Sequence, residues 1–165
     1  LHFLLKEQIF HEPQPLLTEA PKLLGTDGRK MSKSYGNTLA LAESAAGIRA
    51  IVQKMFTDPA RIKMTDAGHP ETCNVCGYWK VFAPDGAARA WEECRTAKRG
   101  CVQNKQELAE ILIEMTEPFR AARQQAASSK TYADIERLLQ EGAKKARAVA
   151  QQTMAEVKTA FGLKK

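Results

Sequence analysis

Two lysines three residues apart, set among hydroxyl side chains and glycines, are the residues of this chain best suited to chemistry. The stretch runs through Lys30, Met31, Ser32, Lys33 and Ser34, with Gly25, Gly28 and Gly36 around it. Lysine carries a compact charge on a flexible stem, which suits a group whose charge moves as bonds break. Glycines let the backbone bend and approach a ligand closely. The pattern indicates a mobile phosphate-binding loop, although a lysine pair at this spacing, taken alone, is more often a solvated basic turn.

The cysteines are the second group of residues that could do chemistry. All four lie in one segment of an otherwise cysteine-free chain, at Cys73, Cys76, Cys94 and Cys101. Cys73 and Cys76 have the C-x-x-C spacing that brings two thiolates onto one metal. Cys94 and Cys101 are separated by six residues, which fits a zinc ribbon poorly. In a cytoplasmic protein such clustering favours a metal centre over a disulfide. Without a metal, the thiols would be buried as small apolar groups.

The elements that must position these residues fall into two parts. Residues 1–42 are rich in prolines and glycines around short apolar segments, as at the end of an α/β domain. From Ser44 onward, apolar residues recur with helical periodicity. We therefore expect a mainly α fold. Residues 1–42 would be the C-terminal end of a nucleotide-binding domain, and residues 43–165 a helical domain with a four-cysteine insert at about 69–104.

Several helices are predicted in the second part. Two of them bury apolar faces made of Ile48, Ile51, Val52 and Met55 and of Leu108, Ile111, Leu112 and Met115. Pro118 either kinks the second of these helices or lies at the start of a new one capped by Thr116. Thr131 caps a short helix that Gly142 ends or bends. The last helix spans about residues 143–161, faces a core and ends at Gly162.

The stretch from residue 19 to residue 38 closely resembles the signature loop of class I aminoacyl-tRNA synthetases, and within them that of the tryptophanyl-tRNA synthetases. The residues that carry the resemblance are Asp27, Gly28, Arg29, Lys30, Met31, Ser32, Lys33, Ser34, Tyr35, Gly36 and Asn37. Residues 141–147 and Thr153 fit the family's last helix, so the resemblance covers essentially all 165 residues. It implies the C-terminal edge of a Rossmann-like α/β catalytic domain, followed by an α-helical anticodon-binding domain.

In family terms, the implied reaction activates tryptophan with ATP and Mg²⁺ to tryptophanyl-adenylate and transfers it to tRNA(Trp). The resemblance makes Lys30 and Lys33 catalytic, because they meet the charge of the leaving pyrophosphate. It makes the whole stretch Lys30, Met31, Ser32, Lys33 and Ser34 nucleotide-binding. Met31 is expected to pack the loop against its own domain rather than to touch ATP. The family also implies a homodimer and a cytoplasmic location.

The family's histidine-rich ATP signature and amino-acid pocket do not occur in this sequence. We therefore expect the C-terminal part of a longer ligase, and we expect this chain alone to be inactive. Two alternatives stay open. One is a stand-alone RNA-binding module that a metal organises and that has no catalytic activity. The other is a non-translational nucleotidyltransferase that reuses the phosphate loop. No apolar run approaches the length of a membrane span.

The net charge of +6 and the isoelectric point near 9.2 favour a polyanionic partner such as RNA. Single-stranded anticodon bases are read by edge hydrogen bonds and stacking, with basic residues on the backbone. The candidate basic residues are Lys98, Arg99, Lys105, Arg120 and Arg123. Trp79 and Trp91 could stack on a base, but the apolar neighbours of Trp79 favour a place in the core.

Some bacterial members of the family that this chain resembles carry a 4Fe–4S cluster in the cysteine region. Their pattern is similar at Cys73, Cys94 and Cys101, with a fourth ligand at the position of Asn104. Because Asn104 is not a thiol, Cys76 could supply the missing ligand and complete a set of four cysteines. An iron–sulfur cluster, Zn²⁺ and no metal are the open alternatives for these residues.

Overall fold

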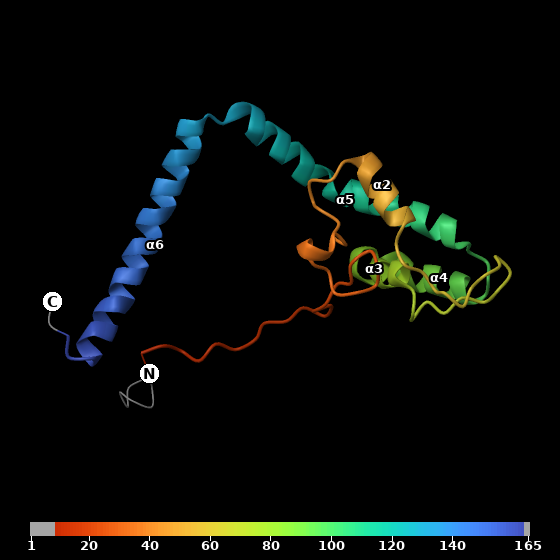
Figure 1. The fold of residues 1–165 in the computed structure, drawn as a ribbon, viewed down its shortest axis with the longest axis horizontal. Helices are drawn as coiled ribbons and strands as arrows, with labels where there is room; N and C mark the ends of the chain where they lie inside the picture. Colours follow the sequence, from red (N-terminus) through yellow and green to blue (C-terminus); the bar gives the residue numbers. More distant parts are fainter. Residues whose placement is uncertain (1–8, 164–165) are drawn as a thin grey trace. The chain divides into compact units, whose positions relative to one another are not determined.

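A computed structural model describes residues 9–163 and shows a helical chain (Figure 1). The helices are η1 (Lys33–Tyr35, a 3-10 turn), α2 (Ala45–Gln53), α3 (Asn74–Phe82), α4 (Pro84–Arg95), α5 (Cys101–Ser129) and α6 (Tyr132–Ala160). Within the described residues no strand forms, and the only extended pairing is an isolated antiparallel bridge between Leu24 and Lys30. The predicted mainly α fold is confirmed.

The described chain divides into two units. One is Leu17–Gln125, which holds the signature loop, α2 to α4 and most of α5. The other contains residues 126–163, with the end of α5 and all of α6, together with residues 9–16. The boundary between the units falls inside α5.

The core of the first unit lies where α2, α3, α4 and the N-terminal half of α5 gather (Figure 1). Its buried side chains are Ile48, Val52, Met55, Cys73, Val75, Cys76, Tyr78, Trp79, Ala90, Cys94, Leu108, Ala109 and Leu112. The two predicted apolar faces therefore do line a core, although Met115, at the end of the second face, is 37% exposed. Each fully buried aliphatic side chain contributes about 1.5–3 kcal/mol by leaving water, which holds α2 against α5.

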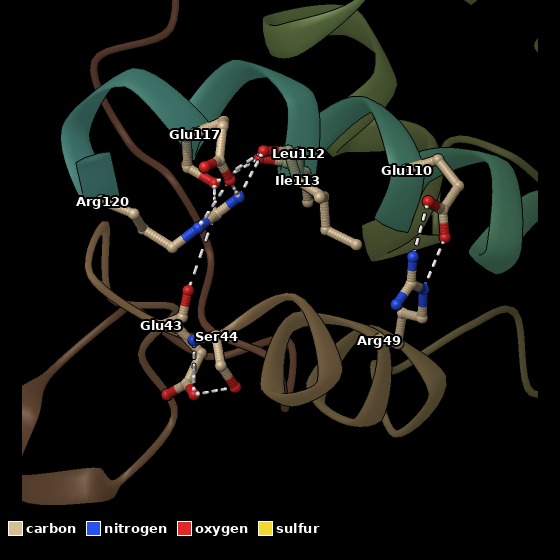
Figure 2. Close-up of polar contacts among 9 residues, drawn as sticks. Glu43, Ser44, Arg49, Glu110, Leu112, Ile113, Glu117 and Arg120 are labelled. Atoms are coloured by element: carbon tan, nitrogen blue, oxygen red, sulfur yellow. Dashed lines mark hydrogen bonds and ion pairs between the residues drawn. The ribbon is translucent and has the colours of Figure 1, made fainter.

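Polar contacts at the surface also join α2 to α5 (Figure 2). The Arg49 guanidinium donates to both carboxylate oxygens of Glu110, at 2.7 and 2.9 Å. Arg120 Nη1 donates to the carbonyl of Glu43 at 3.5 Å, next to Ser44, the N-cap of α2. Exposed ion pairs of this kind contribute about 1 kcal/mol or less, so the buried apolar side chains stabilise the helix pair and the polar contacts orient it.

Pro118 lies inside α5 without ending it. Proline lacks the N–H that would bond the carbonyl four residues back, so the preceding turn loses a helical hydrogen bond. Side chains bind neighbouring carbonyls of this turn: Thr116 Oγ1 donates to Leu112 O at 2.6 Å, and Arg120 Nη2 donates to Ile113 O at 2.8 Å (Figure 2). The predicted cap at Thr116 is therefore wrong. Its hydroxyl donates back along a continuous helix, whereas a cap would accept from the following turn.

The second unit is dominated by α6. Thr131 caps this helix as predicted, because its Oγ1 accepts from Asp134 N at 3.3 Å while the Asp134 carboxylate accepts from Thr131 N at 3.1 Å. Gly142 neither ends nor bends a short helix there, and a single helix runs from Tyr132 to Ala160. A helical glycine costs only about 1 kcal/mol relative to alanine, so the surrounding alanine-rich turns carry the helix through it. Gly162, with a φ of +66°, follows its end as predicted.

The apolar residues of α6 do not face a core in this chain. No residue of α6 is buried, and its exposed large apolar side chains are Tyr132, Ile135, Leu138, Leu139, Val149 and Met154. The prediction that the last helix faces a core is therefore wrong for the described residues. Helical periodicity identifies an apolar face correctly, but it does not identify what covers that face.

One arginine is buried in the first unit. The Arg99 side chain is 2% exposed, and it donates to Glu93 of α4 at 2.7 Å and to Glu107 of α5. Its guanidinium carbon also lies 5.6 Å from the ring centre of Trp79, within cation–π range. These contacts join α4 to α5 across the turn between them. The prediction that Arg99 contacts RNA is wrong, because its charge is already paired and buried.

We expect Arg99→Met to lower the free energy of unfolding by about 3 kcal/mol, because the substitution leaves two carboxylates without their buried cation. Urea unfolding of the full chain measures this loss. Arg89 provides a matched control: it is exposed and its Nη1 lies 3.9 Å from the same Glu93. Arg89→Met should cost less than about 1 kcal/mol. Equal losses in the two variants would contradict the structural role of Arg99.

Candidate functional site

The signature loop is closed at its base and turns twice. Gly25 N donates to Arg29 O at 2.6 Å, beside the bridge between Leu24 and Lys30. Gly28 in the first turn has a φ of +79°, and Gly36, which ends η1, has a φ of +64°. Both values lie in the left-handed region that glycine adopts without strain. The glycines noted in the sequence thus serve turns at the two ends of the lysine stretch.

The two lysines stand on the outside of this loop. The side chains of Lys30 and Lys33 are exposed. Met31, between them, is half-buried as predicted, but the core against which it packs is made of residues 48–112 and not of the loop's own predicted domain. Ser32 Oγ and Ser34 Oγ are hydrogen-bonded to each other at 2.9 Å. Two ammonium groups and two hydroxyls are therefore presented to solvent by a backbone that one apolar side chain fastens to the core, an arrangement suited to an anionic ligand.

A negative charge inside the loop is neutralised locally. Asp27 Oδ1 accepts from Asn37 Nδ2 at 2.7 Å, and its carboxylate accepts from Arg29 N at 3.0 Å and Arg29 Nε at 2.7 Å. These hydrogen bonds, that from Asn37 foremost, lower the pKa of Asp27 to about 2. The Arg29 guanidinium also lies 4.8 Å from the ring centre of Tyr35. Arg29 therefore serves the shape of the loop, and Lys30 and Lys33 carry its outward charge.

Two side chains of helix α3 donate hydrogen bonds to the base of the loop. Asn74 Nδ2 donates to Gly25 O at 2.7 Å, and the Tyr78 hydroxyl donates to Leu24 O at 2.7 Å. Burial raises the pKa of Tyr78 to about 12, so the hydroxyl stays a donor at neutral pH. Sequence reasoning did not find Asn74 or Tyr78 as loop residues. The only signal was their polar atoms on an otherwise apolar helix, and such atoms need a partner when buried.

The cysteines lie at the ends of three helices and converge. Cys73 is the N-cap of α3, Cys76 lies in the first turn of α3, Cys94 lies near the end of α4, and Cys101 begins α5. The first three are buried and Cys101 is half-buried, and all four are free thiols. Cys73, Cys76 and Cys94 belong to the same buried cluster of the first unit. The structure thus places three of the four predicted metal residues in one part of the core.

Asn104, the position where the family pattern has a ligand, reaches the same place. Its Nδ2 lies 3.6 Å from Cys76 Sγ, and its Oδ1 is buried without a hydrogen-bond partner. Cys76 therefore lies beside the residue whose missing thiol it was predicted to replace. Pairing with the Cys76 thiol lowers the pKa of Cys73, and the same pairing together with burial raises the pKa of Cys76.

The thiols suit iron–sulfur or zinc ligation by donor type. Their spacing, however, does not form a metal site: among residues 9–163, no group of three or more histidine, cysteine, aspartate or glutamate side chains is spaced to hold a metal ion. Arg61 Nη1, 3.7 Å from Cys94 Sγ, adds a positive charge beside the cluster. The four cysteines remain candidate ligands by chemistry, and ligation would require their side chains to rearrange.

The predicted RNA contacts divide into exposed and occupied residues. Lys98 and Arg123 are exposed. Lys105 is half-buried and donates to Gln53 O at 2.9 Å. Arg120 donates to the carbonyls of Ile113 and Glu43 and pairs with the Glu117 carboxylate, so its charge is already paired. Exposure therefore leaves Lys98 and Arg123 as the accessible candidates.

Both tryptophans pack in or against the core, which was predicted for Trp79 alone. Trp79 is 3% exposed and belongs to the core, as predicted. Trp91 is half-buried and packs against the core, with Lys80 Nζ 3.8 Å from its ring centre. The outer face of Trp91 is thus covered by a cation, an arrangement typical of a cation–π pair.

Comparison with known proteins matches this arrangement to one family. The family described as "tRNA synthetases class I (W and Y)" matches residues 3–117. A tryptophan–tRNA ligase from Aquifex aeolicus is 44% identical over 158 residues, which cover 94% of this chain and 40% of that protein. The corresponding ligase from Thermotoga maritima is 40% identical over 161 residues, covering 96% and 48%. The structure of tryptophanyl-tRNA synthetase from Campylobacter jejuni, complexed with ADP and tryptophan, superimposes with a TM-score of 0.72 at 26% identity, covering 94% and 48%.

The chain therefore belongs to the class I tRNA synthetases of the tryptophan and tyrosine type. Within that class, the similar proteins named above are tryptophan–tRNA ligases, and the chain spans 40–48% of the length of the two curated relatives. These matches confirm the family resemblance seen in the signature loop. None of the described helices is both long and apolar enough to cross a membrane.

Proposed function

We propose that this chain is the C-terminal part of a tryptophan–tRNA ligase and that its lysine loop serves the activation of tryptophan by ATP. The observation that carries the proposal is the exposed pair Lys30 and Lys33 on a loop that Met31 fastens to the core. In this proposal the remainder of the ligase supplies the tryptophan site and the other ATP contacts. A cytoplasmic homodimer is part of the same proposal, by analogy with the family.

In the proposed reaction, a carboxylate oxygen of tryptophan attacks the α-phosphorus of ATP. The bond from that phosphorus to the bridging oxygen breaks, and pyrophosphate leaves with the electron pair. Lys30 and Lys33 stabilise the charge that accumulates on the pyrophosphate, while Ser32 and Ser34 donate hydrogen bonds to phosphate oxygens. Mg²⁺ bound with ATP supplies further charge neutralisation. The product tryptophanyl-adenylate is then consumed by transfer of tryptophan to tRNA(Trp).

In the full-length ligase, Lys30→Ala and Lys33→Ala should each lower the rate of adenylate formation while tryptophan binding changes little. Each lost contact should cost about 2–4 kcal/mol in the transition state, because the lysines meet charge that develops only there. Tryptophan-dependent pyrophosphate exchange measures the effect. Lys63→Ala, at an exposed lysine outside the loop, is the matched control. Exchange at the wild-type rate in both loop variants would refute the assignment.

We also propose that residues 43–165 form the anticodon-binding domain, with Lys98 and Arg123 on the RNA backbone. Their exposure and the net charge of +6 support this role. A basic residue that contacts a phosphate contributes to affinity through the release of counterions, so its effect depends on the salt concentration and is the same for every sequence.

The double variant Lys98→Ala/Arg123→Ala of the full-length ligase should therefore bind tRNA(Trp) more weakly, with a salt slope smaller by about 2. Filter binding at several salt concentrations measures the slope. A tRNA(Trp) with a changed anticodon is the second arm, and it should bind the wild-type ligase less tightly than the natural tRNA. Equal affinity for the two RNAs would remove the anticodon role and leave only nonspecific attraction.

Finally, we propose that Cys73, Cys76, Cys94 and Cys101 hold a metal centre, a 4Fe–4S cluster in preference to Zn²⁺. The donor set supports this proposal, as do the shared burial of Cys73, Cys76 and Cys94 and the position of Asn104 beside Cys76. Bound metal would be structural here, because it would tie together the ends of α3, α4 and α5 at which the four cysteines lie.

The full-length ligase purified without oxygen should be brown, with a broad absorption at about 400 nm and about four irons per chain. Cys76→Ser should lose most of this iron, whereas Asn104→Ala should retain it, because a carboxamide is not a cluster ligand. A colourless protein with one zinc per chain would indicate a zinc site in place of the cluster. Four titratable thiols and no metal would refute the metal centre altogether.

A further inference from the structure

Asn37 is the only asparagine of the signature loop, and its side chain is turned inward. The residue is 3% exposed, although Lys30, Lys33 and Ser34 near it face solvent. We propose that Asn37 is a positioning residue: its buried carboxamide holds the backbone on both sides of Met31 and thereby sets where Lys30 and Lys33 point. The effect of Asn37 on catalysis rests on the proposed function of the loop, whereas its effect on the loop's conformation does not.

Three side-chain hydrogen bonds define the role. Asn37 Nδ2 donates to Asp27 Oδ1 at 2.7 Å and to Lys30 O at 3.2 Å, and Asn37 Oδ1 accepts from Ser32 N at 2.8 Å. Its backbone carbonyl accepts from Thr26 N at 2.9 Å. One residue at the end of the loop therefore binds the first turn, the middle and the opposite end of the loop.

The bonds to Lys30 O and Ser32 N fix the peptide groups that flank Met31. With both peptide groups held and the Met31 side chain packed on the core, the Lys30 side chain is directed away from the core. Ser32 also begins η1, so its fixed N–H places the turn that carries Lys33. Since both donors of the carboxamide are used inside the loop, Asn37 acts on a ligand through the lysines and not by contact.

The geometry selects asparagine over the other small polar residues. Both amide hydrogens point at acceptors and the amide oxygen points at a donor, so aspartate at this position would face the Asp27 carboxylate and the Lys30 carbonyl without any hydrogen to donate. Gly25 completes the fit. A Cβ there would lie 2.2 Å from Asn37 Nδ2, closer than atoms approach, so the carboxamide occupies the space that the glycine leaves.

The test replaces the amide of Asn37 with a carboxylate in the full-length ligase. Asn37→Asp should lower the rate constant of pyrophosphate exchange by about 100-fold, the scale expected when catalytic groups are misplaced by about an ångström. The KM for tryptophan should not change. Amide hydrogen exchange should become faster at Thr26 and Ser32, whose partners are on residue 37. Gln106→Glu, an amide-to-carboxylate change at an exposed site, is the control and should leave all of these quantities unchanged.

In the double variant Asp27→Asn/Asn37→Asp, the amide at position 27 can donate to the carboxylate at position 37, which can still accept from Ser32 N, while the amide oxygen at position 27 can accept from Arg29 Nε. The bonds of Arg29 N and Lys30 O are not restored. The double variant should therefore recover part of the lost rate, because the bond between residues 27 and 37 is rebuilt with reversed polarity. A general loss of folding would not be repaired in this way. If Asn37→Asp does not fold, as judged by circular dichroism, Asn37→Ser removes the contacts without adding a charge and is measured in its place.

Two results would overturn the proposal. One is wild-type exchange kinetics and wild-type amide protection in Asn37→Asp while Lys30→Ala and Lys33→Ala are slow. The other is a double variant as slow as the single variant, with its amides equally unprotected. If the lysine variants are as fast as wild type, the proposed function fails. In that case, faster hydrogen exchange in Asn37→Asp still supports the structural role of Asn37.

Discussion

The hydrogen bonds from α3 to the base of the signature loop are the contacts on which the described site depends. Asn74 and Tyr78 donate to two successive carbonyls, those of Gly25 and Leu24. The loop closes its own base through the Leu24–Lys30 bridge, but that bridge leaves the carbonyls of Leu24 and Gly25 to be satisfied by donors from outside the loop. Because α3 contributes five buried residues to the first unit, these hydrogen bonds fix the base of the loop to that unit's core. The exposed Lys30 and Lys33 follow this fixed point in the chain.

The same helix begins among the cysteines, so the two chemically distinctive regions of the chain share one element. Cys73 caps α3, Asn74 is its first residue, and Cys76 follows in the same turn. Any change that orders or disorders the start of α3 therefore acts on the Asn74 bond to the loop. Burial makes this coupling strong, because the loss of a buried hydrogen bond leaves a carbonyl unsatisfied at a cost of about 1–3 kcal/mol.

Two of the polar side chains buried in the first unit join separate segments of the chain. Arg99 joins α4 to α5 through Glu93 and Glu107, and Asn37 joins the two ends of the loop. A buried polar group is tolerated only when its partners are present, so each of these side chains stabilises one arrangement of its segments and disfavours others. Helix α6 differs, since its contacts are local caps and its apolar side chains stay exposed in the described chain.

The sequence by itself determined the family, the helical class and the outward chemistry of the loop. The outward position of Lys30 and Lys33 and the inward position of Met31 could be predicted from residue type and order, because a short loop with glycines at both ends is a local structure. The cysteine grouping was also visible, because residue types can be counted without a fold. The helix stripes around Ile48 and Leu108 were visible too, because periodicity is a local property.

Only the tertiary structure decided which polar residues are buried. Arg99 and Arg123 look alike in the sequence, yet one lies between two glutamates and the other faces solvent. Asn37 and Asn74 likewise became positioning residues only once distant segments supplied their partners, Asp27 for the first and Gly25 for the second. The reason is physical. The role of a polar side chain depends on the groups that surround it after packing, and a linear pattern does not contain those neighbours.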